Sequence, residues 1–358
     1  MPLRKTAMLL IKGNEAVAMG AIAAGCRYYF GYPITPQNDI PEYMSAHLPK
    51  IGGVFLQAES EIAAINMLLG ASSTGARAMT SSSSPGISLK QEGLSYMAGS
   101  EIPGVVVNMS RSGPGLGGIH PSQGDYFQAT RGGGHGDYRV IVLAPDGVQE
   151  CYDLTMLAFD LADKYRNPAL ILGDAILGNM KESLTPTPYR PKSIPKPWAL
   201  TGARGRPSQF LKSLYLNDGE LTKHNWKLYK KYQRLTAKEV LCQQLMLEGA
   251  RLILAAFGSM ARVLKTAVVM AREQGLKVGL IRPITLYPFP TAFFEAASAR
   301  CRNFLTMELN TGQMVEDVKL SVRPGAKVDF FGVPPGYIPS PDELLQEIKK
   351  NYPREKRR

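Results

Sequence analysis

Residues 14–36 read NEAVAMGAIAAGCRYYFGYPITP, and this stretch decides the fold. Small apolar residues recur at helical spacing over residues 14–24, which predicts a tightly packed helix. The short aromatic run at residues 27–30 is typical of a strand, and it ends at a turn formed by residues 31–33. A helix that leads directly into a strand is the repeating unit of an α/β domain.

The same alternation continues along the next 150 residues or so. Apolar residues at helical spacing predict further helices at residues 59–70 and 148–162. Continuous aliphatic runs at residues 104–109, 139–143 and 168–172 predict strands buried on both faces of a parallel sheet. We therefore expect residues 1–184 to form a doubly wound α/β domain.

Residues 185–245 interrupt this pattern. Prolines cluster in TPTPYRPKSIPKPW and a polar, basic stretch follows, which predicts a Pro-rich basic linker or surface excursion. A second α/β unit is expected over residues 246–358. Its predicted strands and helices occupy residues 250–258, 259–274, 276–283, 303–309 and 342–350.

Composition restricts the functional class. The 358 residues suggest two domains, and a hydrophobic content of 44% suffices for ordinary cores. No apolar run approaches the ~18 residues of a membrane span, and no cleavage site follows the first apolar stretch. We therefore expect a cytoplasmic protein with no membrane partner. The widely spaced Cys26, Cys151, Cys242 and Cys301 predict reduced thiols, not a metal or iron–sulfur site held by this chain alone.

The chain is strongly basic, with a net charge of +12. Much of this charge lies in residues 181–238 and in the tail at residues 354–358. Nucleic-acid binding would require a helix-turn-helix or basic residues interleaved with a stacking surface, and the sequence contains neither. We therefore do not expect a nucleic-acid partner.

The segment Tyr32-Pro33-Ile34-Thr35-Pro36 follows the first predicted strand. Its two prolines fix the backbone, and hence the Thr35 hydroxyl, at the carboxyl end of a strand, where α/β proteins place ligands. The alternative is a rigid turn in which Thr35 caps the next helix.

Glu61 lies at the start of the apolar helix predicted over residues 59–70. A carboxylate in a first helical turn usually interacts with the helix dipole or caps the turn. The more specific alternative is functional. A Glu partly buried beside apolar residues can hold a proton or hydrogen-bond a ring nitrogen, because desolvation penalises its charged form.

Arg111 follows a predicted strand and precedes a glycine loop, so it can present a bidentate fork to a carboxylate. Gly113, Gly115 and Gly118 also match the G-x-G-x-x-G pattern of dinucleotide sites. We reject an NAD-linked dehydrogenase, because Pro121 interrupts the following segment and that segment lacks a helical apolar face.

Together these segments resemble the alpha subunit of 2-oxoacid:ferredoxin oxidoreductases, most nearly the branched-chain 2-ketoisovalerate type. The resemblance covers almost the whole chain. It is carried by GNEAVAMGAIAAGCRYYFGYPITP, QAESEIAAINMLLGAS, QEGLSYMAGSEIPGVVVNMSRSGPGLGG, PSQGDYFQATRGGGHGDYR, PWALTGARGR, GLIRPITLYPFP and MELNTGQMVEDVKL. It implies a thiamine-diphosphate-binding domain of the pyrimidine type, followed by a transketolase-C-terminal-like α/β domain.

The resemblance also implies roles for single residues. Glu61, preferred to Glu59 because it directly precedes the small apolar run, would hydrogen-bond the aminopyrimidine ring and favour its imino tautomer. Thr35 would face the substrate, and Arg111 would pair with the 2-oxoacid carboxylate or the carbonyl beside it. Further cofactor contacts would come from Tyr32, Pro33 and Ile34.

Partner subunits are implied as well. A beta subunit would bring the diphosphate and Mg²⁺ site and a 4Fe–4S cluster, and gamma and ferredoxin-like delta subunits would accompany it. Coenzyme A would take the acyl group, and ferredoxin the electrons. Residues 173–179, GDAILGN, lack the second glycine of the family's G-D-G motif and have the Asn too early, so this chain is not expected to bind the diphosphate. The basic excess suits an acidic ferredoxin-like partner or the phosphates of coenzyme A.

Two departures from the family pattern leave the substrate open. Ser84 stands where a glycine is commoner, and residues 333–336 replace a glycine-rich stretch. A branched-chain acid is expected; 2-oxoglutarate, which needs a second cation in the pocket, and aryl 2-oxoacids are the alternatives. His120 either faces the pocket or is a solvated loop residue. A non-catalytic assembly subunit is the alternative of another functional class. The absence of Glu61 or Arg111 from the sequence would indicate such a subunit, and both residues are present.

Overall fold

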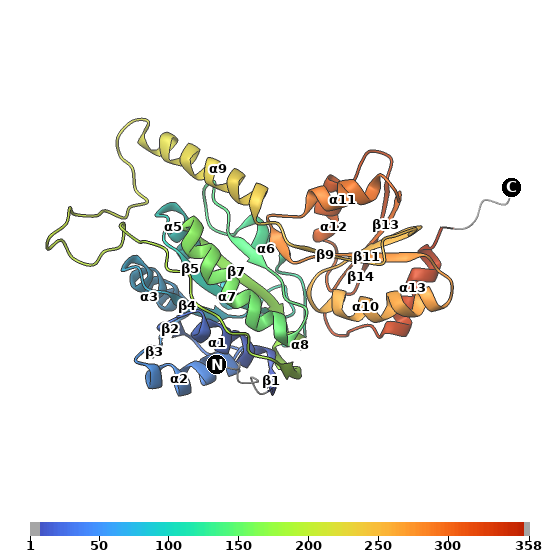
Figure 1. The fold of residues 1–358 in the computed structure, drawn as a ribbon, viewed down its shortest axis with the longest axis horizontal. Coiled ribbons are helices and arrows are strands. Elements are labelled where there is room, and N and C mark those ends of the chain that lie inside the picture. Colours follow the sequence, from blue (N-terminus) through green and yellow to red (C-terminus); the bar gives the residue numbers. More distant parts are fainter. Residues whose placement is uncertain (1–7, 354–358) are drawn as a thin grey trace, which may run out of the picture.

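The computed structural model describes residues 8–353, which form two adjoining α/β units (Figure 1). The first is built on a seven-stranded sheet with the order β12-β6-β7-β5-β4-β2-β3, parallel except for β12. Its strands are β2 (Tyr28–Gly31), β3 (Val54–Gln57), β4 (Ala78–Ser82), β5 (Gly104–Ser110), β6 (Ile141–Leu143), β7 (Pro168–Asp174) and β12 (Thr285–Tyr287). The expected doubly wound domain is confirmed.

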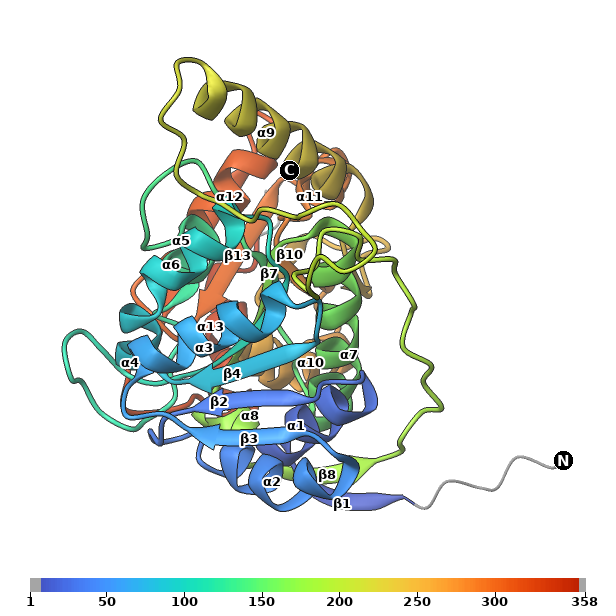
Figure 2. The ribbon, with the colours of Figure 1, turned by 90° about the vertical axis from the view of Figure 1, so that its left-hand side faces the viewer.

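Helices cover both faces of this sheet, as Figure 2 shows. They are α1 (Gly13–Ala23), α2 (Asp39–His47), α3 (Glu61–Ser73), α4 (Ser84–Leu89), α5 (Gln91–Gly99), α6 (Tyr126–Arg131), α7 (Val148–Tyr165) and α8 (Ala175–Asn179), with a 3-10 turn at Pro49–Ile51. Side chains alternate along β5, so that Val105 and Val107 pack with α1 and α7. Val106 instead packs with α3 and α5 on the opposite face.

The second unit contains a five-stranded sheet with the order β14-β13-β10-β11-β9. Its strands are β9 (Cys242–Leu245), β10 (Leu252–Ala255), β11 (Val278–Pro283), β13 (Asn303–Glu308) and β14 (Lys327–Gly332). The helices are α10 (Gly258–Glu273), α11 (Thr291–Ser298), α12 (Met314–Ser321) and α13 (Pro341–Asn351). α10 and α13 pack together on one face, and α11 and α12 on the other.

The segment predicted as a linker contains a long helix that the sequence did not indicate. After β8 (Lys181–Leu184), which pairs with β1 (Leu9–Lys12), the chain is irregular until α9 (Glu220–Lys238) begins. Figure 1 shows α9 in yellow at the top of the first unit. The helix buries Leu228, Tyr232 and Leu235 at helical spacing together with Lys231, but it lies within a Pro-rich, basic stretch that was interpreted as a linker.

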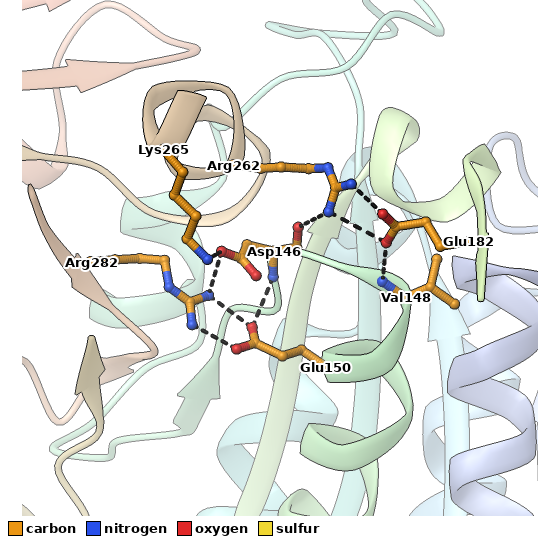
Figure 3. Close-up of polar contacts among 7 residues, drawn as sticks. All are labelled: Asp146, Val148, Glu150, Glu182, Arg262, Lys265 and Arg282. Carbon is orange, nitrogen blue, oxygen red and sulfur yellow. Dashed lines mark hydrogen bonds and ion pairs between the residues drawn. The ribbon is translucent and has the colours of Figure 1, made fainter. Parts of the chain in front are cut away.

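Ion pairs connect the two units, as Figure 3 shows. Arg282 of β11 is 1% exposed and donates to both carboxylate oxygens of Glu150 of α7, over 2.6 and 2.8 Å. On α10, Lys265 lies 2.5 Å from Asp146, and Arg262 pairs with Glu182. One apolar cluster also crosses the boundary and includes residues of both units. The units are therefore fixed relative to one another by apolar and charged contacts.

Residues 1–7 and 354–358 lie outside the described range, so neither the first residues of the chain nor the basic tail is placed. Within residues 8–353, no helix combines the length and apolar character that crossing a bilayer requires.

Candidate active site

The predicted site residues gather at one edge of the first sheet. Thr35 follows β2, Glu61 follows β3, and Arg111 follows β5. The strands β3, β2, β4 and β5 are neighbours and run parallel, so their carboxyl ends lie at the same edge. This is the edge at which open α/β sheets bind ligands.

Glu61 is the first residue of α3 and is 7% exposed, whereas Glu59 is exposed. Ser60 caps the helix, because its hydroxyl accepts a hydrogen bond from the Ala63 backbone N–H at 3.2 Å. Among the described residues, no donor hydrogen-bonds the Glu61 carboxylate. Buried carboxylates are normally hydrogen-bonded, so the free acceptors of Glu61 suit a donor that the chain itself does not supply.

Gly86 allows the backbone of α4 to approach the Glu61 carboxylate closely. A Cβ atom at this position would lie 2.6 Å from Oε1 of Glu61 and 2.1 Å from Oγ of Ser82. The hydroxyls of Ser82 and Ser83, at the end of β4, are buried without a hydrogen-bond partner, and so is that of Ser110, which ends β5. The sheet edge at which Glu61 lies therefore combines close packing with unpaired polar atoms.

Arg111 connects the glycine loop with the Thr35 turn. Its side chain donates from Nη1 to the backbone oxygen of Thr35 at 3.0 Å and from Nη2 to the backbone oxygen of Leu116 at 3.3 Å. The residue is 9% exposed, and its buried Nε has no partner. A guanidinium held in this way retains an N–H for an incoming acceptor.

The turn after β2 leaves its side chains available. Tyr32, Pro33 and Thr35 are exposed, and Ile34 is half-buried. α2 begins at Asp39 after Asn38, so the alternative in which Thr35 caps the next helix is wrong.

Ser84 ties the ends of β4 and β5 together. Its Oγ accepts from the Arg111 backbone N–H at 2.9 Å and contacts Oδ2 of Asp125 at 2.7 Å. Asn108 contributes to the same cluster, because its side-chain oxygen accepts from the Ser84 backbone N–H at 3.1 Å and its amide donates to Asp125 at 2.8 Å. The serine noted as a departure from the family pattern thus fixes the backbone of Arg111.

Lys90 was not predicted as a site residue. It is fully buried between α4 and α5, and its Nζ donates to the Glu61 backbone oxygen at 3.2 Å and to Oγ1 of Thr80 at 3.1 Å. Desolvation lowers the pKa of Lys90 to about 8, although attraction to Glu61 opposes this shift. The sequence signal is faint, since a single lysine in an otherwise regular helical stretch reads as a solvated residue.

The motifs set aside in the sequence have structural roles. Asp174 caps α8 by accepting from the backbone N–H groups of Ile176 and Leu177, both at 3.0 Å, and it also contacts Ser259 of the second unit. No helix directly follows the glycines at residues 113–118, because the next one, α6, starts at Tyr126. His120 is an exposed loop residue.

The four cysteines are free thiols. Cys26, Cys151 and Cys301 are buried and Cys242 is half-buried, as expected for reduced thiols. In residues 8–353, His, Cys, Asp and Glu side chains form no group of three or more that suits a metal ion.

Comparison with known proteins extends this geometry. Residues 19–237 match the family described as pyruvate flavodoxin/ferredoxin oxidoreductase, thiamine diphosphate-binding, and residues 250–352 match the pyruvate:ferredoxin oxidoreductase core domain II. The chain is 50% identical over 317 residues to the ketoisovalerate oxidoreductase subunit VorB of Methanothermobacter marburgensis. The aligned region covers 87% of this chain and 89% of that protein.

Two solved structures share the fold. A 2-oxoglutarate:ferredoxin oxidoreductase from Magnetococcus marinus, with 2-oxoglutarate, coenzyme A and succinyl-CoA bound, superposes with a TM-score of 0.88 at 28% identity. The match covers 97% of this chain but 65% of that longer chain. A split-gene transketolase, an inactive beta4 tetramer, gives a TM-score of 0.57 at 11% identity over 96% and 98% of the two chains. The likeness to transketolase shows the fold alone.

These matches confirm both the predicted fold class and the resemblance found in the sequence. The chain belongs to the 2-oxoacid:ferredoxin oxidoreductase family, as the subunit that contains the thiamine diphosphate-binding domain.

Proposed function

We propose that this subunit takes part in the oxidative decarboxylation of a branched-chain 2-oxoacid to its acyl-coenzyme A, with ferredoxin as electron acceptor. The observation that carries the proposal is the Glu61 carboxylate, which is buried, has no donor among the described residues, and shares a sheet edge with Thr35 and Arg111. A general acid–base group and a carboxylate-binding arginine at one edge suit 2-oxoacid chemistry.

The residues present fit the aminopyrimidine of thiamine diphosphate. The free Glu61 acceptors suit a ring N–H donor, and Gly86 has no side chain that would cover Oε1. When bound, the cofactor supplies a nucleophile and an electron sink for decarboxylation. Among the described residues, His, Cys, Asp and Glu side chains form no group of three that suits a metal ion, and we assign the diphosphate, Mg²⁺ and the 4Fe–4S cluster to a beta subunit.

Each site residue then has a physical task. Glu61 accepts a hydrogen bond from the ring nitrogen and so sets which tautomer of the ring is favoured. Arg111 offers its unpaired Nε–H to the substrate carboxylate. Thr35 orients the acid through its hydroxyl, and Tyr32, Pro33 and Ile34 form the wall beside the ring.

An exposed apolar rim around this edge supports a partner subunit that closes the site. It consists of Tyr32, Leu56, Ile62, Leu116 and Ile119, which are between 36% and 80% exposed. Side chains of this kind on neighbouring strand ends are typical of protein interfaces. We propose that the beta subunit packs against this rim. Gamma and ferredoxin-like delta subunits would lie elsewhere in the complex, and the complex would act in the cytoplasm.

The substrate proposal rests on sequence similarity. Half of the aligned residues are identical to a ketoisovalerate oxidoreductase subunit, which favours a branched-chain acid. The solved relative with 2-oxoglutarate bound keeps a dicarboxylate as the second candidate. An aryl 2-oxoacid remains a third.

Co-expression with its genomic neighbours and anaerobic purification of the complex test this function. We expect reduction of a viologen acceptor that depends on thiamine diphosphate, coenzyme A and one class of 2-oxoacid, and loss of that activity in Glu61→Gln. An active Glu61→Gln complex would contradict the role of Glu61. A complex that fails to reduce the acceptor with every 2-oxoacid tested would favour an assembly subunit.

A further inference from the structure

Lys90 is a buried cation that the proposed chemistry does not yet use. Its side chain is fully buried, and both contacts of its Nζ are neutral oxygens, of the Glu61 backbone and the Thr80 hydroxyl. Among the described residues it forms no ion pair. An ammonium group removed from water without a carboxylate partner destabilises the fold, and its lowered pKa reflects this desolvation.

Packing alone does not require a lysine here. A methionine is almost as long, fills the same volume and carries no charge to desolvate. Compared with methionine, the lysine adds two directional hydrogen bonds and a positive charge. Its role therefore depends on which neighbouring group these bonds and this charge act on.

Both hydrogen bonds fix the position of Glu61. The backbone oxygen that Lys90 contacts belongs to the first residue of α3, so the contact ties the start of this helix to Thr80 of β4. On its other side the Glu61 carboxylate meets Gly86, where a Cβ would lie 2.6 Å from Oε1. Glu61 is thus held from two directions, by the buried lysine and by the backbone of α4.

We propose that Lys90 is a positioning residue for Glu61, holding the start of α3 in place and supplying a positive charge beside the carboxylate that meets the cofactor ring. This inference rests on the proposed role of Glu61. Glu61 of α3 is the charged group that acts on Lys90, and Thr80 of β4 contributes an uncharged hydroxyl. Loss of the Lys90 proton therefore removes the positive charge next to Glu61.

The test compares Lys90→Met with Lys231→Met in the co-expressed complex. Lys231 is the matched control, because it is also buried with a pKa of about 8 but lies on α9 beside Glu101, outside the site. For Lys90→Met we expect kcat/KM for the 2-oxoacid to fall about 10- to 100-fold, because one or two charge-assisted hydrogen bonds that position Glu61 are lost. For wild type we expect kcat/KM to decline as the pH rises through about 8, where Lys90 loses its proton. This decline should be absent in Lys90→Met and present in Lys231→Met.

Wild-type kcat/KM and an unchanged pH profile in Lys90→Met would overturn the proposal, and so would an equal loss in Lys231→Met. If Lys90→Met does not assemble, Thr80→Val carries the test, because it removes one acceptor of Nζ at nearly constant shape. In Thr80→Val the decline in kcat/KM must move to lower pH, because the charged form of Lys90 loses one hydrogen-bond acceptor. A pH profile of kcat/KM identical to that of wild type would overturn the proposal. Glu61→Gln separates the two ideas, because an active Glu61→Gln complex contradicts the proposed role of Glu61, whereas an inactive one leaves the Lys90 variants to test this inference.

Discussion

Nη1 of Arg111 lies 3.0 Å from the backbone oxygen of Thr35, which joins two residues that are 76 positions apart in the sequence. The contact places the end of β5 against the turn after β2. It also leaves Nε of Arg111 buried and unpaired. The arginine thus connects two loops and keeps one buried N–H unpaired, and its fork of N–H groups makes both possible.

Replacement of Arg111 by lysine should separate charge from geometry. The ammonium retains the positive charge but cannot contact the Thr35 and Leu116 carbonyls and an acceptor at the same time. We expect kcat/KM for the 2-oxoacid to fall about 10- to 100-fold, mainly through KM. Arg27→Lys, at an exposed position, is the control, and a steady-state assay of the complex provides the measurement. Unchanged kinetics in Arg111→Lys would refute the assigned contact.

Ser84→Ala should destabilise the backbone around Arg111. Without Oγ the Arg111 backbone N–H loses its acceptor, and one buried polar group is left unpaired. We expect a loss of about 1–3 kcal/mol in unfolding free energy, together with lower kcat/KM. Ser45→Ala, on the surface of α2, should change neither quantity. Urea denaturation and kinetics on the same preparations check both, and a stable, fully active Ser84→Ala would show that the cluster is dispensable.

The sequence pattern placed three candidate residues after or near predicted strands, but it did not predict the residues that pack around them. Thr35 and Arg111 follow predicted strands and Glu61 lies in a predicted helix, but β3 and β4, which complete this edge of the sheet, were not predicted. β4 was missed because its buried sequence, AMTSS, contains small polar residues that do not look like a core strand. Gly86 and Lys90 follow this strand, so their nearness to Glu61 could not be inferred.

Long-range pairing was also beyond the sequence. β12 follows β11 of the second sheet in the chain but pairs with β6 of the first. Its three residues carry no sign of which sheet they join. Similarly, the ion pair of buried Arg282 with half-buried Glu150 joins residues 132 positions apart and depends on how the two units meet.

Arg282→Met should destabilise the protein by about 1–3 kcal/mol, because it leaves the half-buried Glu150 carboxylate without its two hydrogen bonds and takes Arg282 away from Asp146. The double variant Arg282→Met with Glu150→Leu should recover part of this loss, since the Glu150 charge is then absent as well, while Asp146 still lacks Arg282. Chemical denaturation measures the cycle. Equal stability of the single and double variants would argue that the pair is not coupled.

Acid should weaken the same interface. Desolvation raises the pKa of Glu150, but its hydrogen bonds with Arg282 and the charge of Arg282 outweigh this and hold the pKa below its usual value. A carboxyl with a lowered folded-state pKa contributes stability that is present above 4.5 and lost as the pH falls through the folded value. The stability difference between wild type and the double variant should therefore shrink below pH 4.5; a constant difference would contradict the assignment.

Lys231 should give the protein a distinct pH dependence at the alkaline side. Desolvation lowers its pKa from 10.5 to about 8, against the opposing attraction of Glu101. Between these values the unfolded chain binds the lysine proton more than the folded chain does, so the contribution of Lys231 to stability rises with pH. Relative to Lys231→Met, wild type should gain up to about 1.4 kcal/mol per pH unit between pH 8 and 9, with no change below pH 7. Leu228→Met, on the same helix and without a titratable group, should show a constant offset across this range. Denaturation midpoints measured from pH 6.5 to 9 decide the matter, because parallel curves for wild type and Lys231→Met would mean that the buried lysine keeps its ordinary affinity for the proton.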